Sequence, residues 1–383
     1  MEESVLQKET FLQQAKKYLK NLPNRYFITA FSGMALGLFC TLIAGTILSL
    51  VASWLGDNKI GYILSTISTI AKILMGAGIG IGIAYKLNAK PLVIFSAAVS
   101  GFIGAFALEI INQTFDSSFF GKLFLLGKPG NPIGAYVLAL LTVEICNLYA
   151  GKTKLDIVLI PLGMMVLSII GIYVAWPFIK LIDLFAELLV VLINAGSAIK
   201  IITGVVIAIV MGILLTMPTS SAAIWLSIAT SNTAVNNPEV FGIAGGAAVA
   251  GCAAHMIGFA VASYRENGFA GLISQGIGTS MLQIPNIMVK PIIMLPEVVS
   301  SAIAGLVAVL LDMRCNAAGG GMGTSGLVGL FGVIEASAGI PIVNMVLGIV
   351  LCLFVIPVVI TLLCSEFMRI KGYIKFGDMK LPE

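Results

Sequence analysis

The chain of 383 residues is poor in charge and rich in apolar side chains. Charged residues make up 10% of it and apolar residues 58%, and its mean hydropathy is +1.04. A soluble domain is usually about a quarter charged, so this composition excludes an ordinary soluble globular protein. The net charge of +4, spread along the chain without a basic domain, gives no support for nucleic-acid binding.

Long apolar runs follow one another along the chain. A bilayer core about 30 Å thick requires roughly 20 apolar residues per helix, so these runs predict about ten membrane-spanning helices. The expected spans cover residues 27–55, 61–85, 91–112, 132–150, 156–179, 200–217, 239–262, 268–285, 292–311 and 341–367. The eighth is the weakest, because Gln275, Thr279 and Gln283 interrupt it. The sequence therefore predicts an all-α polytopic membrane protein.

The positions of Lys and Arg predict the orientation of these spans. Residues 1–22 are polar and roughly amphipathic, which favours a helix on the inner membrane face over a cleaved signal peptide. With that end inside, fourteen Lys and Arg residues fall in the inner tails and loops and seven in the outer segments. Because basic residues concentrate on the cytoplasmic side, we expect both termini in the cytoplasm and an even number of spans.

Two halves of the chain are joined by a segment unlike either. Residues 180–199 carry Lys180, Asp183 and Glu187 on one helical stripe, which is typical of a connector helix at the membrane interface. Residues 1–179 contain five clean spans, which suit a scaffold and dimer interface. Residues 200–383 contain interrupted hydrophobic runs, which suit a moving substrate domain.

Closely spaced glycines recur in the first half. They are Gly33, Gly37, Gly76, Gly78, Gly80 and Gly82. Such spacing lets helix backbones approach closely, and it fits either packing within one subunit or a dimer contact.

Two stretches of the second half are expected to enter the membrane without crossing it. Residues 218–238 hold a short apolar run but are too polar for a lipid-facing span, and residues 313–340 place glycines before a short apolar helix. Non-helical backbone at membrane depth is tolerated only where protein or a water-filled cavity satisfies its polar groups. Interrupted segments of this kind point to the substrate site of a transporter, although ordinary surface loops are the alternative.

Two titratable side chains are the main candidates for contact with a solute. His255, the only histidine, lies mid-span among small residues, where it would either bond between helices or contact a substrate. Glu335 ends the apolar helix of the second interrupted stretch. A carboxylate accepts hydrogen bonds from two hydroxyls at once, as sugar recognition requires, whereas pairing with Arg314 or Asp312 would make Glu335 structural.

Neutral polar side chains surround the interrupted stretches. Asn232 and Asn286 lie near them, and Thr324 and Ser325 belong to the glycine-rich run at 319–326. We expect these four residues to contribute to the substrate site, because such groups suit a neutral polyol better than a strongly charged solute.

Charged side chains also lie inside spans of the first half. Glu144 lies well inside one span and Lys72 inside another. Proton coupling is conceivable for Glu144, but a hydrogen bond between helices is the favoured interpretation, and Lys72 is one candidate partner.

No catalytic motif, metal site or cofactor is expected. The run GGGMGTSG has no Lys before its Thr-Ser pair, so the Walker pattern fails. A lone histidine and six cysteines without CxxC spacing indicate neither a zinc site nor a disulfide framework. The absence of an Arg ladder and of a TVGYG filter argues against a selective cation channel.

The second half resembles a known family. The segments MPTSSAAIWL, GCAAHMIGFAVAS, SMLQIPNIMVKPIIMLPEVVSSAIAG and GGGMGTSGLVG are similar to the membrane IIC component of the bacterial phosphotransferase system, in the branch of perfringolysin-regulator-like proteins. The resemblance implies a bacterial cytoplasmic membrane, an N-terminal dimerisation domain and a C-terminal transport domain. It also implies two re-entrant hairpins and elevator-like movement.

The family pattern assigns roles to two residues. In sugar-transporting relatives a histidine and the glutamate of a G-I-T-E-P motif hold the sugar. Here GVIEA is similar to that motif, with Glu335 at the glutamate and His255 upstream. Val, Ile and Ala replace the Ile, Thr and Pro of the motif, which weakens the assignment. Phosphorylation of a sugar would require separate IIA and IIB proteins, because no segment here resembles their soluble domains.

These observations predict a dimeric membrane carrier of a small polar solute, most simply a carbohydrate. Two other classes stay open. A facilitator or exporter independent of the phosphotransferase system would need no protein partner, and a membrane sensor would act on gene expression indirectly, without net transport. The sequence names neither the solute nor the energy source.

Overall fold

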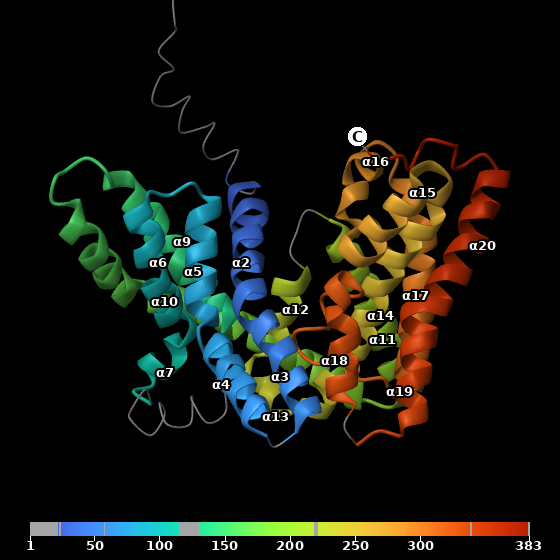
Figure 1. Cartoon of the computed structure of the whole chain (residues 1–383), viewed down its shortest axis with the longest axis horizontal. Coiled ribbons are helices and arrows are strands. Elements are labelled where there is room, and N and C mark those ends of the chain that lie inside the picture. The colour runs from blue at the N-terminus through green and yellow to red at the C-terminus, as the bar shows by residue number, and fades with distance from the viewer. Residues whose placement is uncertain are drawn as a thin grey trace, which may run out of the picture.

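The computed structural model describes residues 22, 24–56, 58–114, 130–217, 221–337 and 339–381. The expected helix at 1–22 lies outside these residues, apart from Leu22. The described chain consists of helices and connecting segments, with no strand among the residues placed. Its first helix begins at the end of the molecule where the C-terminus also lies (Figure 1). An even number of crossings would produce this arrangement.

The first half of the chain forms a bundle at one side of the molecule (Figure 1). Its helices are η1 (Asn24–Ala30), α2 (Phe31–Leu38), η2 (Phe39–Ile43), α3 (Ala44–Leu55), α4 (Lys59–Ile73), α5 (Met75–Lys86), α6 (Pro91–Ala105), α7 (Ala107–Ile111), α9 (Pro132–Tyr149) and α10 (Asp156–Asn194).

The second half packs beside it. Its helices are α11 (Ser197–Thr216), α12 (Ser221–Ala229), α13 (Asn232–Asn236), α14 (Pro238–Ala262), α15 (Tyr264–Ile273), η3 (Ser274–Gly278), η4 (Ser280–Gln283), α16 (Ile284–Val289), η5 (Pro291–Met294), α17 (Leu295–Leu310), η6 (Ser325–Leu327), α18 (Val328–Ala336), α19 (Ile342–Gly348), η7 (Ile349–Val355) and α20 (Ile356–Ile370).

The apolar helices confirm a protein that crosses a membrane many times. Seven continuous helical runs of the described residues are long and apolar enough to span a bilayer, and α4 with α5, bent by 54°, would make an eighth. Two of the ten expected spans are not among these. Residues 91–112 form the shorter apolar helix α6 followed by α7, and residues 268–285 form a series of short helices.

The glycines of the first half bring helices of one subunit together. A Cβ on Gly37 of α2 would lie 2.2 Å from the carbonyl oxygen of Gly78 on α5, and one on Gly101 of α6 would lie 2.2 Å from the carbonyl oxygen of Gly76. Real Cβ atoms do not approach backbone this closely, so only glycine permits these contacts. The glycine spacing fitted either packing within one subunit or a dimer contact, and these contacts are packing within one subunit.

The expected connector continues the fifth span. Helix α10 is 39 residues long and passes through the segment predicted to be a separate interfacial helix at 180–199, ending at Asn194. Within it Asp183 is buried, and its carboxylate accepts a hydrogen bond from the backbone N–H of Asn232 at 3.1 Å. The polar stripe therefore packs partly against α13.

Helices α11 and α14 run parallel. Gly204 of α11 lies beside Ala247 of α14, and eight residues later Gly212 lies beside His255. Because α11 and α14 run in the same direction, the chain between them must go back to the end at which α11 began. Helices α12 and α13 make that return along α14. The expected re-entrant segment at 218–238 does not fit this geometry, because its described part leads from one end of α14 to the other. Residues 218–220 lie outside the described chain.

Helix α17 runs antiparallel to α14. Glu297 in its first turn lies beside Gly258, and Ser301 donates a hydrogen bond to the carbonyl oxygen of Gly251 at 3.4 Å. Since both helices meet at the C-terminal end of α14, the chain between them stays at that end. The expected span at 268–285 is therefore wrong. Residues 263–294 instead form a hairpin of short helices, here called the α15–α16 hairpin, at the end where the chain terminates (Figure 1).

A second hairpin packs along α14 from the opposite end. The backbone N–H of Cys315 donates to the carbonyl oxygen of Gly242 near the start of α14, and Thr324 reaches Met256 near its end. Helix α18 then returns, so that Asn316 and Glu335 lie side by side. We call residues 312–337 the α18 hairpin. Apart from residue 312, they lie within the re-entrant segment predicted at 313–340, and whether they re-enter a membrane stays a prediction.

Candidate functional site

Helix α14 is the axis of the candidate site. Its segment 242–255, GIAGGAAVAGCAAH, consists mostly of small residues, and all fourteen of these residues are buried. A Cβ on Gly246 would lie 1.8 Å from the carbonyl oxygen of Met313, and one on Gly323 would lie 2.7 Å from the carbonyl carbon of Cys252. Small residues therefore allow the α18 hairpin to lie directly against the helix backbone.

His255 is fully buried in a short chain of polar contacts. Its Nδ1 lies 2.8 Å from the hydroxyl oxygen of Thr216, the last residue of α11. The same hydroxyl lies 3.0 Å from that of Ser280 in the α15–α16 hairpin. The second ring nitrogen, Nε2, has no hydrogen-bond partner among the described residues. A buried nitrogen without a partner is costly, so this side of the ring is suited to meet another polar group.

The two hairpins meet next to this chain of contacts. The hydroxyl of Thr324 donates to the carbonyl oxygen of Gly276 at 2.5 Å, and that of Ser325 donates to the carbonyl oxygen of Gly278 at 2.9 Å. Thr324 also lies 3.6 Å from the sulfur of Met256, the neighbour of His255. Of the predicted site residues, Thr324 and Ser325 both bond to the α15–α16 hairpin, and His255 is linked to the same hairpin through Thr216 and Ser280. Their contact with a solute stays a prediction.

Glu335 lies at the base of the α18 hairpin. Asn316 donates a hydrogen bond from Nδ2 to Glu335 Oε2 at 2.5 Å, and its Oδ1 accepts from the backbone N–H of Gly319. Arg314 and Asp312, the other candidate partners, pair with each other at 3.0 Å. Lys72 of α4 interacts electrostatically with the carboxylate of Glu335.

The base and the tip of this hairpin are far apart. Residue Gly242 marks the level of the base on α14, and His255 marks the level of the tip. Thirteen residues of α-helix separate them, which corresponds to about 20 Å. Glu335 and His255 therefore do not touch one small solute together in this conformation.

The two predicted asparagines lie elsewhere. Asn232 is exposed at the start of α13, where its backbone N–H bonds to Asp183. Asn286 donates to Gln283 Oε1 at 2.7 Å and to the carbonyl oxygen of Lys380 at 2.9 Å, so it braces the α15–α16 hairpin. Their expected contact with a solute stays a prediction.

A cavity opens beside the base of the α18 hairpin. It has a volume of about 470 Å³ and its lining includes Glu239, Arg314, Asn316 and Ala336. Arg314 Nη1 lies 3.8 Å from Glu239 Oε1 across it. This volume falls in the usual range for small-molecule sites, and its polar groups stand next to the Glu335–Asn316 pair.

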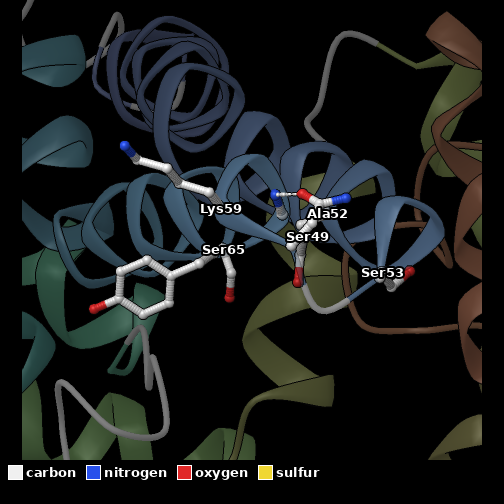
Figure 2. Close-up of a pocket in the computed structure, with 9 residues that line it drawn as sticks. Ser49, Ala52, Ser53, Lys59 and Ser65 are labelled. Carbon is white, nitrogen blue, oxygen red and sulfur yellow. Dashed lines mark hydrogen bonds between the residues drawn. The ribbon is translucent and has the colours of Figure 1, made fainter.

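The first half carries a larger cavity, of about 650 Å³, at the turn between α3 and α4. Figure 2 shows Ser49, Ser53 and Ser65 around it, with Lys59 at one side. Asn58 caps α4 there by accepting from the backbone N–H of Gly61 at 2.8 Å. None of the predicted site residues lines this cavity.

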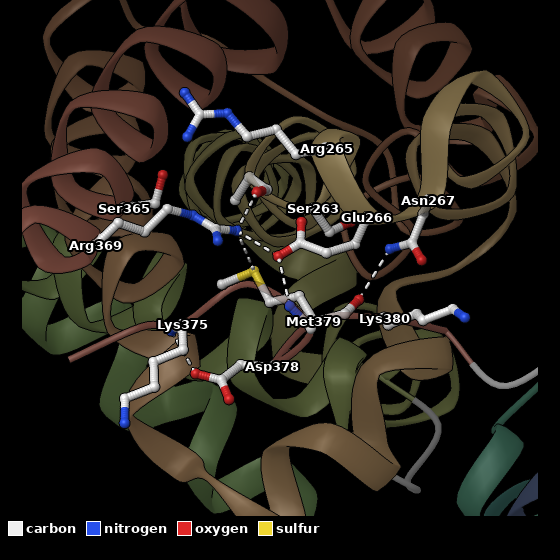
Figure 3. A network of polar contacts seen from close by, with 12 residues as sticks. Ser263, Arg265, Glu266, Asn267, Ser365, Arg369, Lys375, Asp378, Met379 and Lys380 are labelled. Carbon is white, nitrogen blue, oxygen red and sulfur yellow. Dashed lines mark hydrogen bonds and ion pairs between the residues drawn. The ribbon is translucent and has the colours of Figure 1, made fainter. Parts of the chain in front are cut away.

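The C-terminal segment fastens the α15–α16 hairpin. Figure 3 shows Arg369 directed at Glu266, 2.9 Å away, and Asn267 bonded to the backbone of Met379. Gln283, fully buried, donates to the same carbonyl oxygen of Met379 at 2.9 Å. The hairpin whose tip contacts Thr324 is thus held from behind by the end of the described chain.

Several site residues escaped the sequence reasoning. Thr216 and Ser280 hold His255, and Asn316 holds Glu335, yet each is an ordinary polar residue whose partner is distant in sequence. Gln275, Thr279 and Gln283 did give a signal, because they interrupted the weakest span. Glu144, expected to bond between helices, pairs with Arg25 at 2.6 Å. No group of three or more metal-binding side chains occurs within the part of the chain described.

Many apolar helices and two hairpins that meet beside a buried histidine define a multi-pass membrane protein of the transporter class. A family model described as "Phosphotransferase system, EIIC" matches residues 28–381. The chain therefore belongs to the phosphotransferase system EIIC family and is a permease component for sugar transport. No curated protein and no solved structure matches it significantly. The expected family is confirmed, while its branch stays a prediction.

Proposed function

We propose that the chain carries a carbohydrate across the bacterial cytoplasmic membrane, with both termini in the cytoplasm and the sugar held where the two hairpins meet. The observation that carries this proposal is the contact of the hairpin tips beside His255, made by Thr324 with Gly276. The site offers hydroxyls, backbone carbonyls and one free ring nitrogen, and it offers no fixed positive charge at the tips. Such groups suit a neutral polyol.

Glu335 serves in this proposal as the first contact for the sugar. The amide of Asn316 now donates to its carboxylate as a sugar hydroxyl would, and the 470 Å³ cavity lies next to this pair. An arriving hydroxyl would replace the amide. The α18 hairpin would then be free to shift, which would bring sugar, tip residues and His255 together despite the present separation of about 20 Å.

Elevator-like movement would proceed along the contact between the two halves. Helix α18 meets α3 there, with the rings of Trp54 and Phe331 at a centroid distance of 6.2 Å. Helix α12 meets α2 and α9. We propose that residues 1–179 hold the dimer together while residues 200–383 move, and that separate IIA and IIB proteins phosphorylate the sugar.

The test is a thermal-shift screen of purified protein in detergent against sugars, polyols and sugar acids. A ligand that binds only the folded state raises the melting temperature by mass action. We expect a carbohydrate to do so for wild type and for the control Glu366→Gln, which alters a partly exposed carboxylate on α20 that pairs with Arg265. Glu335→Gln and His255→Ala should lose the shift. An unchanged shift in both variants would show that the site is misplaced.

The movement has its own test. A cross-link between cysteines introduced at positions 54 and 331, in a background without the native cysteines, should stop uptake of the identified sugar into liposomes. Binding of the sugar should persist. Uptake that continues in the cross-linked protein would contradict the elevator proposal, while the binding result would stand.

A further inference from the structure

A carboxyl group lies fully buried in the second half without any partner. Glu297 belongs to the first turn of α17, its exposed fraction is 0%, and neither carboxyl oxygen has a hydrogen-bond partner among the described residues. The sequence reasoning passed over this residue, although it has the same signal as Glu144, a lone acid inside an expected span. The Glu144 carboxylate has Arg25 beside it, whereas no cation from the described part of the chain lies beside Glu297.

A second unpartnered oxygen lies beside it. Thr361 of α20 is also fully buried, and its hydroxyl has no partner among the residues placed. Both side chains face Gly258 of α14, where an added Cβ would lie 2.9 Å from Glu297 Cγ and 2.9 Å from Thr361 Oγ1. Glycine at this position therefore leaves room for two polar groups that would otherwise meet a side chain.

The neighbouring hydroxyls are already engaged. Ser301 donates to the backbone carbonyl of Glu297 at 2.8 Å, and Ser300 donates to that of Ile356 at 3.4 Å. The elements packed against α17 carry eight other ionisable side chains: Glu239, Cys252 and His255 on α14, Cys364, Glu366 and Arg369 on α20, Cys352 on η7 and Lys200 on α11. Glu366 pairs with Arg265, Lys200 lies 3.9 Å from Asp312, and Glu239 lies 3.8 Å from Arg314. Arg369 and Glu266, further along at this end, bond to each other.

An ionised carboxylate in such a place is strongly disfavoured, because its own backbone N–H offsets only part of the lost hydration and no cation or hydroxyl among the described residues bonds to it. The neutral acid is the form that burial allows. The start of α17 works in the other direction, since the positive end of the helix dipole favours a negative charge. These opposed effects make Glu297 a group that ionises once water reaches it.

We propose that Glu297, with Thr361 beside it, is a proton-binding site that moves with residues 200–383. The carboxylate takes one proton from water when its pocket is open and keeps it as the neutral acid while the pocket is closed. It returns the proton to water on the other side. Gly258 is one helical turn from His255, so proton and sugar sites share α14. The movement of this site and its coupling to sugar rest on the proposed elevator-like transport, whereas the buried neutral acid itself does not.

Infrared spectroscopy of the purified protein in lipid, at neutral pH, tests the site without any sugar. A protonated carboxyl gives a C=O stretching band distinct from that of a carboxylate. We expect this band in wild type, its loss in Glu297→Gln, and its retention in Glu144→Gln, where the removed group is an ion paired with Arg25. Thr361→Val should keep the band and shift its frequency, because the hydroxyl next to the acid is lost.

Two results would overturn the proposal. One is an acid band in Glu297→Gln equal to that of wild type, in protein shown by gel filtration and circular dichroism to be folded. If that variant does not fold, the other is a Thr361→Val band at the wild-type frequency. Coupling is then tested in liposomes, where an inward pH gradient should speed sugar uptake several-fold in wild type and leave Glu297→Gln unchanged. Failure of sugar uptake alone leaves the infrared result standing.

Discussion

Thr216 Oγ1 lies 2.8 Å from Nδ1 of His255 and 3.0 Å from the hydroxyl of Ser280, so one threonine ties together α11, α14 and the α15–α16 hairpin. Its position at the last residue of α11 is what allows this, because the helix ends there and the side chain faces its neighbours. The orientation of the histidine ring thus depends on a residue nearly forty positions earlier in the chain.

Thr216→Val should lower the free energy of unfolding by about 1–3 kcal/mol, because it leaves His255 Nδ1 and Ser280 without their shared partner. Thr142→Val is the matched control. Thr142 is equally buried, but its hydroxyl bonds only to carbonyls of its own helix, at 3.0 and 3.1 Å. Denaturant unfolding in mixed micelles gives both values. If both variants lose the same free energy of unfolding, the contacts of Thr216 with His255 and Ser280 add nothing to stability.

The glycines of the α18 hairpin give a paired prediction. Gly323 and Gly326 both have positive φ, +55° and +53°, so alanine at either position costs about 1–2 kcal/mol in backbone strain. A Cβ on Gly323 would also lie 2.7 Å from the carbonyl carbon of Cys252, whereas at Gly326 the nearest atom is 3.8 Å away. Gly323→Ala should therefore cost ~1–3 kcal/mol more than Gly326→Ala.

Comparing melting temperatures of the two variants isolates the contact with α14 from the strain that they share. Limited proteolysis should show the same order, with the hairpin of Gly323→Ala cut faster. If Gly326→Ala proves the more damaging of the two, the hairpin does not lie on α14 as described.

Composition and hydropathy were enough to predict the fold class and most of the spans, since lipid exposure selects apolar residues directly. They could not separate a crossing from a hairpin. Residues 218–238 and 268–285 are both moderately polar and interrupted, and the packing of α14 against α11 and α17 does not fit a hairpin at the first or a single crossing at the second. What decides between them is the parallel packing of α11 and α14, which depends on contacts such as that of Gly212 with His255.

The candidate site was only partly predictable for a similar reason. Thr324 and Ser325 bond to the α15–α16 hairpin, to which His255 is linked through Thr216 and Ser280. Motif similarity had pointed to His255 and Glu335. Motif similarity says nothing about distance, however, and Glu335 lies about 20 Å along the helix from His255. The bonds of Thr216 and Asn316 are purely tertiary.

Asn316→Ala should loosen the base of the α18 hairpin. The substitution removes the donor to Glu335 at 2.5 Å and the acceptor of the Gly319 N–H at 2.7 Å. Hydrogen exchange of the backbone amides between 316 and 335 should accelerate, because opening of the hairpin no longer breaks these bonds. Measured by mass spectrometry, the effect should be confined to this hairpin.

Asn58→Ala serves as the control for that measurement. Asn58 also accepts a hydrogen bond from a backbone N–H three residues on, that of Gly61 at 2.8 Å, but it caps α4 in the first half. Its loss should accelerate exchange at the start of α4 and leave residues 316–335 unchanged. Faster exchange of the α18 hairpin in both variants would point to general destabilisation.

The C-terminal segment should detach as the pH falls. Partial burial acts to raise the pKa of Asp378, but Lys290 Nζ and the backbone N–H of Lys375, each 2.6 Å away, outweigh it and hold the pKa below its ordinary value of 3.8. A carboxylate with a lowered pKa stabilises the folded state above its ordinary pKa and loses that contribution as the pH falls through the lowered value. Asp378→Asn should therefore reduce the melting temperature at about pH 6, and the reduction should shrink progressively as the pH falls below 3.8.

Glu366→Gln, which removes a more exposed partner of Arg265, is the control and should track wild type over the same pH range. A difference between Asp378→Asn and wild type that stays constant over this range would show that the charge of Asp378 does not fasten the segment.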